Sequence, residues 1–155
     1  MSRVAIANLI SSQIGRILED WYILVSDESQ AEYSNSLSGA KLIEHVPSII
    51  LHICELLGDT ESPSARCSLE DRTTVYLPFQ QGYKGLEVIR ELSLLRATLL
   101  DYLTDISRRD PPTLTREEHC QAARIINRYL DEEMDYALSI FCNASIDSTN
   151  TPLPN

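Results

Sequence analysis

Apolar side chains recur every three or four positions over most of the chain, which is the spacing of one face of an α-helix. The clearest run covers residues 85–107, with apolar positions at Leu86, Val88, Ile89, Leu92, Leu95, Leu99, Leu103 and Ile106. The apolar face is widened by Leu94, Leu100 and Tyr102, and the opposite face carries Glu87, Arg90, Glu91, Arg96, Asp101 and Asp105. Because so much of its circumference is apolar, we expect this helix to lie centrally, in contact with several others.

The same period predicts a long helix at each end of the chain. The first covers residues 3–25 and includes Trp21 as a core anchor, and the last ends near residue 144. At roughly 1.5 Å per residue the first helix would be about 33 Å long, which is more than a compact domain of this size easily covers. We therefore expect its beginning to project and to pair with a second copy of the chain through Ile6, Leu9, Ile10 and Ile14.

Turn-forming residues divide the segments that follow the first helix. Residues 26–39 are rich in Ser, Asp, Glu, Gln and Asn, which predicts a surface connection. Pro47 interrupts the apolar run 40–57 and disfavours helical geometry at the residue before it. This pattern predicts two segments, the second of which begins with Pro47 in its first turn and ends at Gly58 as a left-handed cap.

The second half of the chain carries two further start signals for helices. Ser62-Pro63 predicts a helix over residues 62–76, and Thr115 with Glu118 forms a capping box before the last helix. The acidic run 131–135 within that last helix is interpreted as a solvated face. Few β-branched runs alternate with period two, so we predict an all-α bundle of five to seven helices.

Length and charge limit the kinds of partner. A chain of 155 residues is long enough for one core, and we expect a helical domain over residues 1–144 with a flexible linker or tail over 145–155. The net charge of −10 repels nucleic acid and anionic lipid surfaces. No apolar run is long enough to cross a membrane, and the N-terminus lacks the pattern of a signal peptide. We therefore expect a cytoplasmic domain.

Histidine and cysteine are the residue types that could hold a cofactor, and the candidates are His45, His52 and Cys67. The two histidines are seven residues apart, but Pro47 lies between them, and no familiar set of three or four metal ligands is present. Cys67 precedes acidic residues as in bilin-attachment helices, but the match is loose and we favour an inert thiol. The chain also lacks a G-x-S-x-G motif and a phosphate-binding glycine loop. We predict a non-catalytic protein with no metal and no bound cofactor.

Several landmarks together resemble the RsbRD N-terminal domain family, whose members are bacterial all-helical sensor domains placed ahead of signalling modules. The landmarks are Trp21, the segment LIEHVPSIIL at 42–51, Gly82-Tyr83, Leu86-Glu87-Val88-Ile89-Arg90-Glu91 with Leu94-Leu95-Arg96, and Ile126-Asn127-Arg128-Tyr129-Leu130-Asp131. The family often shows a His-Gly and an Arg before the glycine, whereas residues 72–78 here read RTTVYLP, so the roles of that His and Arg are not carried over. The small polar residue that usually caps the central helix is replaced by Lys84 or Gly85.

The resemblance implies a globin-like sensory fold, dimerisation and signal output to a domain beyond Asn155. The expected function is a sensory or signal-transfer domain at the N-terminus of a bacterial two-component histidine kinase or stress-response regulator. Such a domain would form a homodimer, respond to an unidentified small ligand and relay a conformational change. The alternative is a globin-like domain that binds haem or a bilin through His45, His52 or Cys67, and a passive scaffold is a third interpretation.

Overall fold

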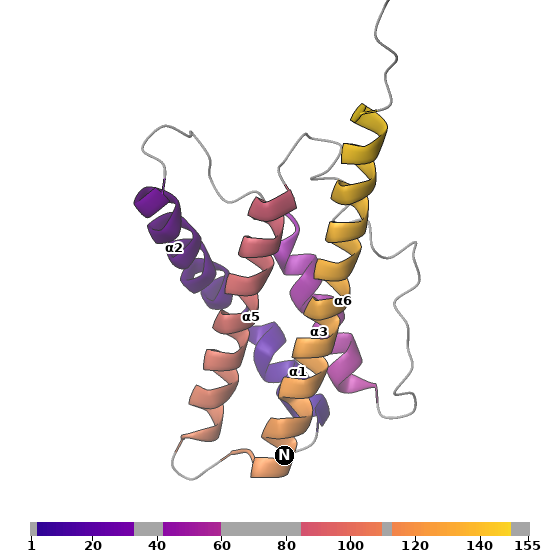
Figure 1. The fold of residues 1–155 in the computed structure, drawn as a ribbon. Coiled ribbons are helices and arrows are strands. Elements are labelled where there is room, and N and C mark those ends of the chain that lie inside the picture. The colour runs from indigo at the N-terminus through magenta and orange to yellow at the C-terminus, as the bar shows by residue number, and fades with distance from the viewer. Residues whose placement is uncertain (1–2, 33–41, 60–84, 110–112, 150–155) are drawn as a thin grey trace, which may run out of the picture.

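The computed structural model describes residues 3–32, 42–59, 85–109 and 113–149. These residues form five α-helices, which are α1 (Arg3–Ser12), α2 (Ile14–Glu32), α3 (Val46–Gly58), α5 (Gly85–Ser107) and α6 (Arg116–Thr149). No β-strand occurs in the described part of the chain. The prediction of an all-α helical bundle is therefore confirmed (Figure 1).

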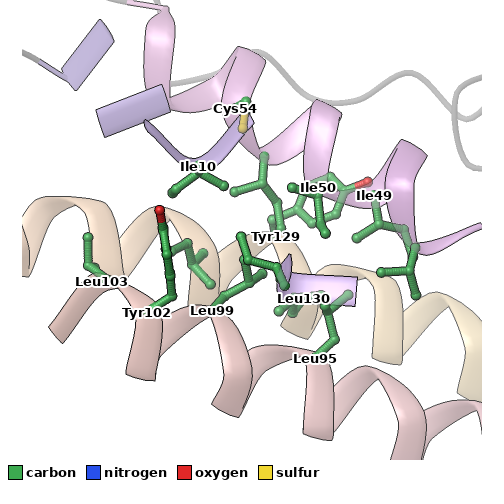
Figure 2. Close-up of a cluster of buried hydrophobic side chains, with 14 of the residues drawn as sticks. Ile10, Ile49, Ile50, Cys54, Leu95, Leu99, Tyr102, Leu103, Tyr129 and Leu130 are labelled. Atoms are coloured by element: carbon green, nitrogen blue, oxygen red, sulfur yellow. The ribbon is translucent and has the colours of Figure 1, made fainter. Parts of the chain in front are cut away.

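The central position expected for residues 85–107 is observed in α5. This helix packs against α2 on one side and α6 on another, while α1 packs against α3. Its buried residues recur along its whole length, from Val88 to Ile106. Figure 2 shows part of the core that they form, where the labelled residues are Ile10, Ile49, Ile50, Cys54, Leu95, Leu99, Tyr102, Leu103, Tyr129 and Leu130.

The prediction of a single helix over residues 3–25 is wrong, because helical structure is interrupted at Gln13, between α1 and α2. The Gln13 N–H bonds to the Ile10 carbonyl at 3.0 Å, across three residues instead of four. The hydroxyls of Ser11 and Ser12 also donate to carbonyls three residues earlier, and such local bonds compete with regular helix geometry. The expected long first helix is therefore two shorter ones.

Helix α2 continues beyond the expected end of the first helix. Residues 26–32 were expected to belong to a surface connection, but α2 includes them and ends at Glu32. No glycine or proline lies between Trp21 and Glu32, so nothing in the local sequence forces the helix to stop earlier. In Figure 1, α2 leans away from α5 toward its own C-terminal end.

The prediction for Pro47 is confirmed, whereas the prediction for Gly58 is wrong. Pro47 lies in the first turn of α3, after a turn over residues 42–45. Gly58 is the last residue of α3, does not have the positive φ of a left-handed cap, and is followed by extended backbone at Asp59. The end of α3 is instead completed by Arg3, whose guanidinium donates to the Leu56 carbonyl at 2.9 Å.

The capping box at the start of α6 is confirmed. The Thr115 N–H donates to Glu118 Oε2 at 2.8 Å, and the Glu118 N–H donates to Thr115 Oγ1 at 3.2 Å. The helix ends at Thr149, five residues beyond the expected residue 144, because the first proline after its start is Pro152. The helix predicted over residues 62–76 lies outside the described residues.

Helix α6 is the longest described element. Its 34 residues correspond to about 51 Å, compared with about 34 Å for the 23 residues of α5. Figure 1 shows its C-terminal end rising beyond the start of α5. Buried residues occur in α6 from Ala122 to Ala137, and residues 138–143 are exposed or half-buried. The first part of α6 therefore belongs to the core, Ile140 and Phe141 still pack against it, and the helix then continues beyond them.

Candidate functional site

A buried polar contact joins α2, α5 and the turn that precedes α3. The Trp21 indole N–H donates to the backbone carbonyl of Glu91 at 2.9 Å, and the Leu42 backbone N–H donates to Glu91 Oε2 at 2.7 Å. Trp21 and Leu42 are fully buried, and only 6% of Glu91 is exposed. We refer to Trp21, Leu42 and Glu91 as the Trp21–Glu91 junction.

The buried position of Glu91 corrects its assignment to the polar face of the central helix. Glu91 lies three residues after Val88 and four before Leu95, both of which are fully buried. This spacing places Glu91 on the apolar face. The spacing was the available signal of its burial, but the charged side chain led to its assignment to the polar face. A buried carboxyl group is costly unless it is hydrogen-bonded, and the Leu42 N–H supplies one such bond. The junction thereby fixes the turn before α3 against α5.

Glu133 on α6 corrects the sequence interpretation in the same way. It belongs to the acidic run 131–135, which was expected to be solvated, yet only 1% of it is exposed. Its neighbours Asp131 and Asp135 are exposed as expected. Glu133 lies three residues after Leu130 and four before Ala137, so it follows the buried spacing of α6. Each of the two long helices therefore carries one glutamate among its core positions.

Helices α5 and α6 are also joined at their rim by Arg96. Its guanidinium forms an ion pair with the Asp131 carboxylate at 2.5 Å and approaches the Met134 sulfur at 3.5 Å. The Asp131 side chain is 60% exposed, so solvent screens this pair and its contribution to stability is small. The ion pair matters for its location, because Arg96 lies five residues after Glu91 on the same helix. One stretch of α5 thus contacts both α2 and α6.

The candidate histidines occupy different places along α3. His45 immediately precedes the helix and caps it with no side-chain hydrogen bond, whereas His52 lies within it. About 10 Å of helical rise separates the two, which is too far for both to bind one small ion. His52 Nδ1 instead lies 3.5 Å from the Tyr129 hydroxyl of α6. The structure therefore presents two separate histidines, of which one contacts the core phenol of Tyr129.

The described residues include three free cysteines, of which Cys54 is buried and Cys120 and Cys142 are exposed. Cys67 lies outside the described residues. Burial, with a smaller contribution from the Glu55 carboxylate, raises the pKa of the Cys54 thiol to about 11, so Cys54 is a poor nucleophile. Among the residues that the structure describes, no three His, Cys, Asp or Glu side chains are grouped to hold a metal ion.

The residues expected at a dimer interface pack within the chain. Ile6 and Ile10 are fully buried, and Leu9 and Ile14 are half-buried against the same core. The break at Gln13 accounts for this, because α1 is a separate short helix that lies on α3. Ile6 and Ile10 therefore present no surface to a second copy. Trp21, interpreted as a core residue, is fully buried.

Comparisons of the chain with protein-family models, with curated proteins and with solved structures find no match. None of the helices in the described ranges combines the length and apolar character needed to cross a membrane. The features of the described chain that bear on function are the Trp21–Glu91 junction, the contacts of α5 and the extent of α6.

Proposed function

We propose that this chain is a non-catalytic signal-transfer domain of a bacterial two-component histidine kinase or stress-response regulator. The observation that carries the proposal is the division of α6. The helix has fully buried residues as far as Ala137 and core contacts as far as Phe141, and it continues as one helix to Thr149. A rigid helix that leaves a core transmits a small rotation or shift to whatever is attached to its end.

Helix α5 provides the path by which an input reaches α6. The Trp21–Glu91 junction links α5 to α2 and to the turn before α3, and Arg96 links it to α6. A change in the packing of α2 would displace α5 and therefore alter the position of α6. In this proposal the bundle has two packing states, and a small ligand that binds one of them more tightly shifts their populations.

The proposal includes a cytoplasmic homodimer, as the resemblance to the RsbRD N-terminal domain family implies. Since Ile6 and Ile10 are buried, the pairing surface is assigned to Leu86 and Leu138, which are 71% and 46% exposed. Both lie where the start of α5 meets α6, because a side chain at Gly85 would contact Phe141. Pairing there would place the ends of two α6 helices beside each other, ahead of the output domains.

Sedimentation velocity at micromolar concentration tests the dimer. We expect the wild-type chain to sediment as a dimer and Leu138→Glu to shift it to a monomer, because a charge would be buried in the interface. The control is Ser93→Glu, which places the same charge at an exposed position of α5 and should leave the dimer intact. A monomeric wild-type chain, or equal weakening by both variants, contradicts this pairing.

The coding sequence beyond Asn155 tests the signalling role. A kinase, a stress-signalling module or a transcriptional regulator is expected there, and a stop codon or a metabolic enzyme contradicts the proposal.

An absorption spectrum of protein from cells supplied with haem or bilin provides a second test. A Soret or bilin band at stoichiometric pigment would favour the cofactor-binding alternative.

A further inference from the structure

The hydroxyl of Tyr102 is a buried polar group that lies outside the Trp21–Glu91 junction. Only 8% of the residue is exposed, and its oxygen has no hydrogen-bond partner among the described residues. Buried hydroxyl groups in proteins are almost always hydrogen-bonded to protein, water or ligand. A phenol group that is nine-tenths buried and unpartnered therefore indicates a place where a ligand atom can bind.

Two arginines lie near this hydroxyl. Burial raises the pKa of the Tyr102 phenol, and the positive charges of Arg109 and Arg16 act in the opposite direction. Arg109 is close enough to approach the phenol oxygen, but its guanidinium does not reach hydrogen-bond geometry. Both arginines have exposed side chains, so their guanidinium groups can move to meet a ligand.

Three parts of the chain bring these groups together. Tyr102 belongs to the last third of α5, Arg109 follows the end of that helix, and Arg16 lies in the first turn of α2. Figure 2 shows the Tyr102 hydroxyl pointing toward Ile10 of α1, three residues before the break at Gln13. The phenol therefore points toward the place where α1 ends and α2 begins.

The charges around this place favour an anion. The first turn of α2 contains no acidic residue. Arg16 does have a carboxylate neighbour, Asp20, but the contact is long at 3.9 Å and both side chains are more than half exposed. Such a contact is weak and easily exchanged. In a chain of net charge −10, the charges that act on this buried phenol are those of two arginines.

We propose that Tyr102, Arg16 and Arg109 bind an oxyanion group, the carboxylate or phosphate of a small molecule. The Tyr102 hydroxyl donates one hydrogen bond to the anion, and the guanidinium groups donate charge-assisted bonds. Asp20 competes with the ligand for Arg16. This binding site does not depend on the signalling role proposed above, since a protein of any function could use it.

Thermal unfolding of the full chain tests this site, with inorganic phosphate and succinate as probes, each compared with sodium chloride at equal ionic strength. We expect at least one of the two anions to raise the unfolding midpoint, because it binds the folded state. Which anion does so distinguishes a phosphate ligand from a carboxylate ligand. If neither raises the midpoint above the chloride control, the proposal is wrong.

The variants separate specific binding from a general effect of salt. Tyr102→Phe removes only the unpartnered hydroxyl, so it should fold normally and lose most of the anion-dependent shift. Arg16→Gln and Arg109→Gln should lose it as well, and Asp20→Asn should increase it by removing the competing carboxylate. The control is Arg124→Gln, an exposed arginine of α6 that should keep the full shift. An equal shift in wild type and Tyr102→Phe, or a loss in Arg124→Gln, would overturn the proposal.

Discussion

The two long helices of this bundle differ in how much of their length the core holds. Helix α5 buries residues at regular intervals from Val88 to Ile106, so neither end is free of the core. Helix α6 has fully buried residues between Ala122 and Ala137 and half-buried core contacts at Ile140 and Phe141, and it then continues to Thr149. The difference indicates that α5 contributes to the core along its whole length, whereas the part of α6 after Phe141 can move or bind a partner at little cost to the core.

The largest expected effect comes from truncating a leucine in the core of α5. Leu99→Ala should lower the free energy of unfolding by about 2–5 kcal/mol, because it removes fully buried methyl groups and leaves a cavity. Leu138→Ala, in the last part of α6, should change it by less than about 0.5 kcal/mol. Urea unfolding followed by circular dichroism measures both values, and similar losses for the two variants would remove the distinction between the helices.

The Trp21–Glu91 junction should have the next largest effect. Glu91→Ala leaves the buried N–H of Leu42 without this acceptor, which should cost roughly 1–3 kcal/mol. Glu91→Gln keeps an oxygen acceptor and should cost less. Asp101→Ala is the matched control, because Asp101 is an exposed acid on the same helix. Urea titrations of the three variants test this order, and a Glu91→Ala protein as stable as the Asp101→Ala protein would show that the junction contributes nothing.

The contact between Gly85 and Phe141 holds α6 against the first residues of α5. A Cβ atom at Gly85 would lie 2.7 Å from Phe141 Cγ, so Gly85→Ala should destabilise the fold by about 1–3 kcal/mol through overpacking. A Cβ at Gly15 meets nothing within 4 Å, so Gly15→Ala should stabilise α2 by about 0.5–1 kcal/mol. Thermal melts compare the two variants. Equal signs would mean that Phe141 does not pack on Gly85.

The capping box at the start of α6 should make the smallest of the main destabilising contributions. Thr115→Ala removes the hydroxyl that accepts from the Glu118 N–H and should cost about 1 kcal/mol. Thr115→Ser keeps the cap and is the control. The loss should appear in the midpoint of urea unfolding, since the first part of α6 unfolds with the core. An unchanged midpoint would indicate that this cap frays without affecting the bundle.

Local signals in the sequence predicted the helices whose ends carry capping or helix-breaking residues. The bounds of α5, the place of Pro47 and the capping box at Thr115 all follow from spacing and from residues that act on their own backbone. The break at Gln13 was missed because the apolar period continues through it. The bonds of Ser11 and Ser12 to nearby carbonyls are optional in any helix, so their presence alone does not predict a break.

The polar contacts of the interior were less predictable than the core itself. Trp21 was expected in the core and is buried there, but its acceptor is a backbone carbonyl 70 residues away, and any carbonyl can serve. Glu91 could have been placed by its spacing from Val88 and Leu95. The approach of Arg16 to Tyr102 could not have been predicted, because neither local sequence determines the angle at which α2 crosses α5.

Native-state hydrogen exchange along α6 is the decisive measurement of where the core ceases to hold this helix. We expect the amides of residues 126–137 to exchange only through global unfolding, with the same protection as the core of α5. The amides of residues 143–149 should exchange through local opening and be at least roughly 100-fold less protected. Equal protection along the whole of α6, or weak protection before Ala137, would contradict a helix that is anchored in the core and then leaves it.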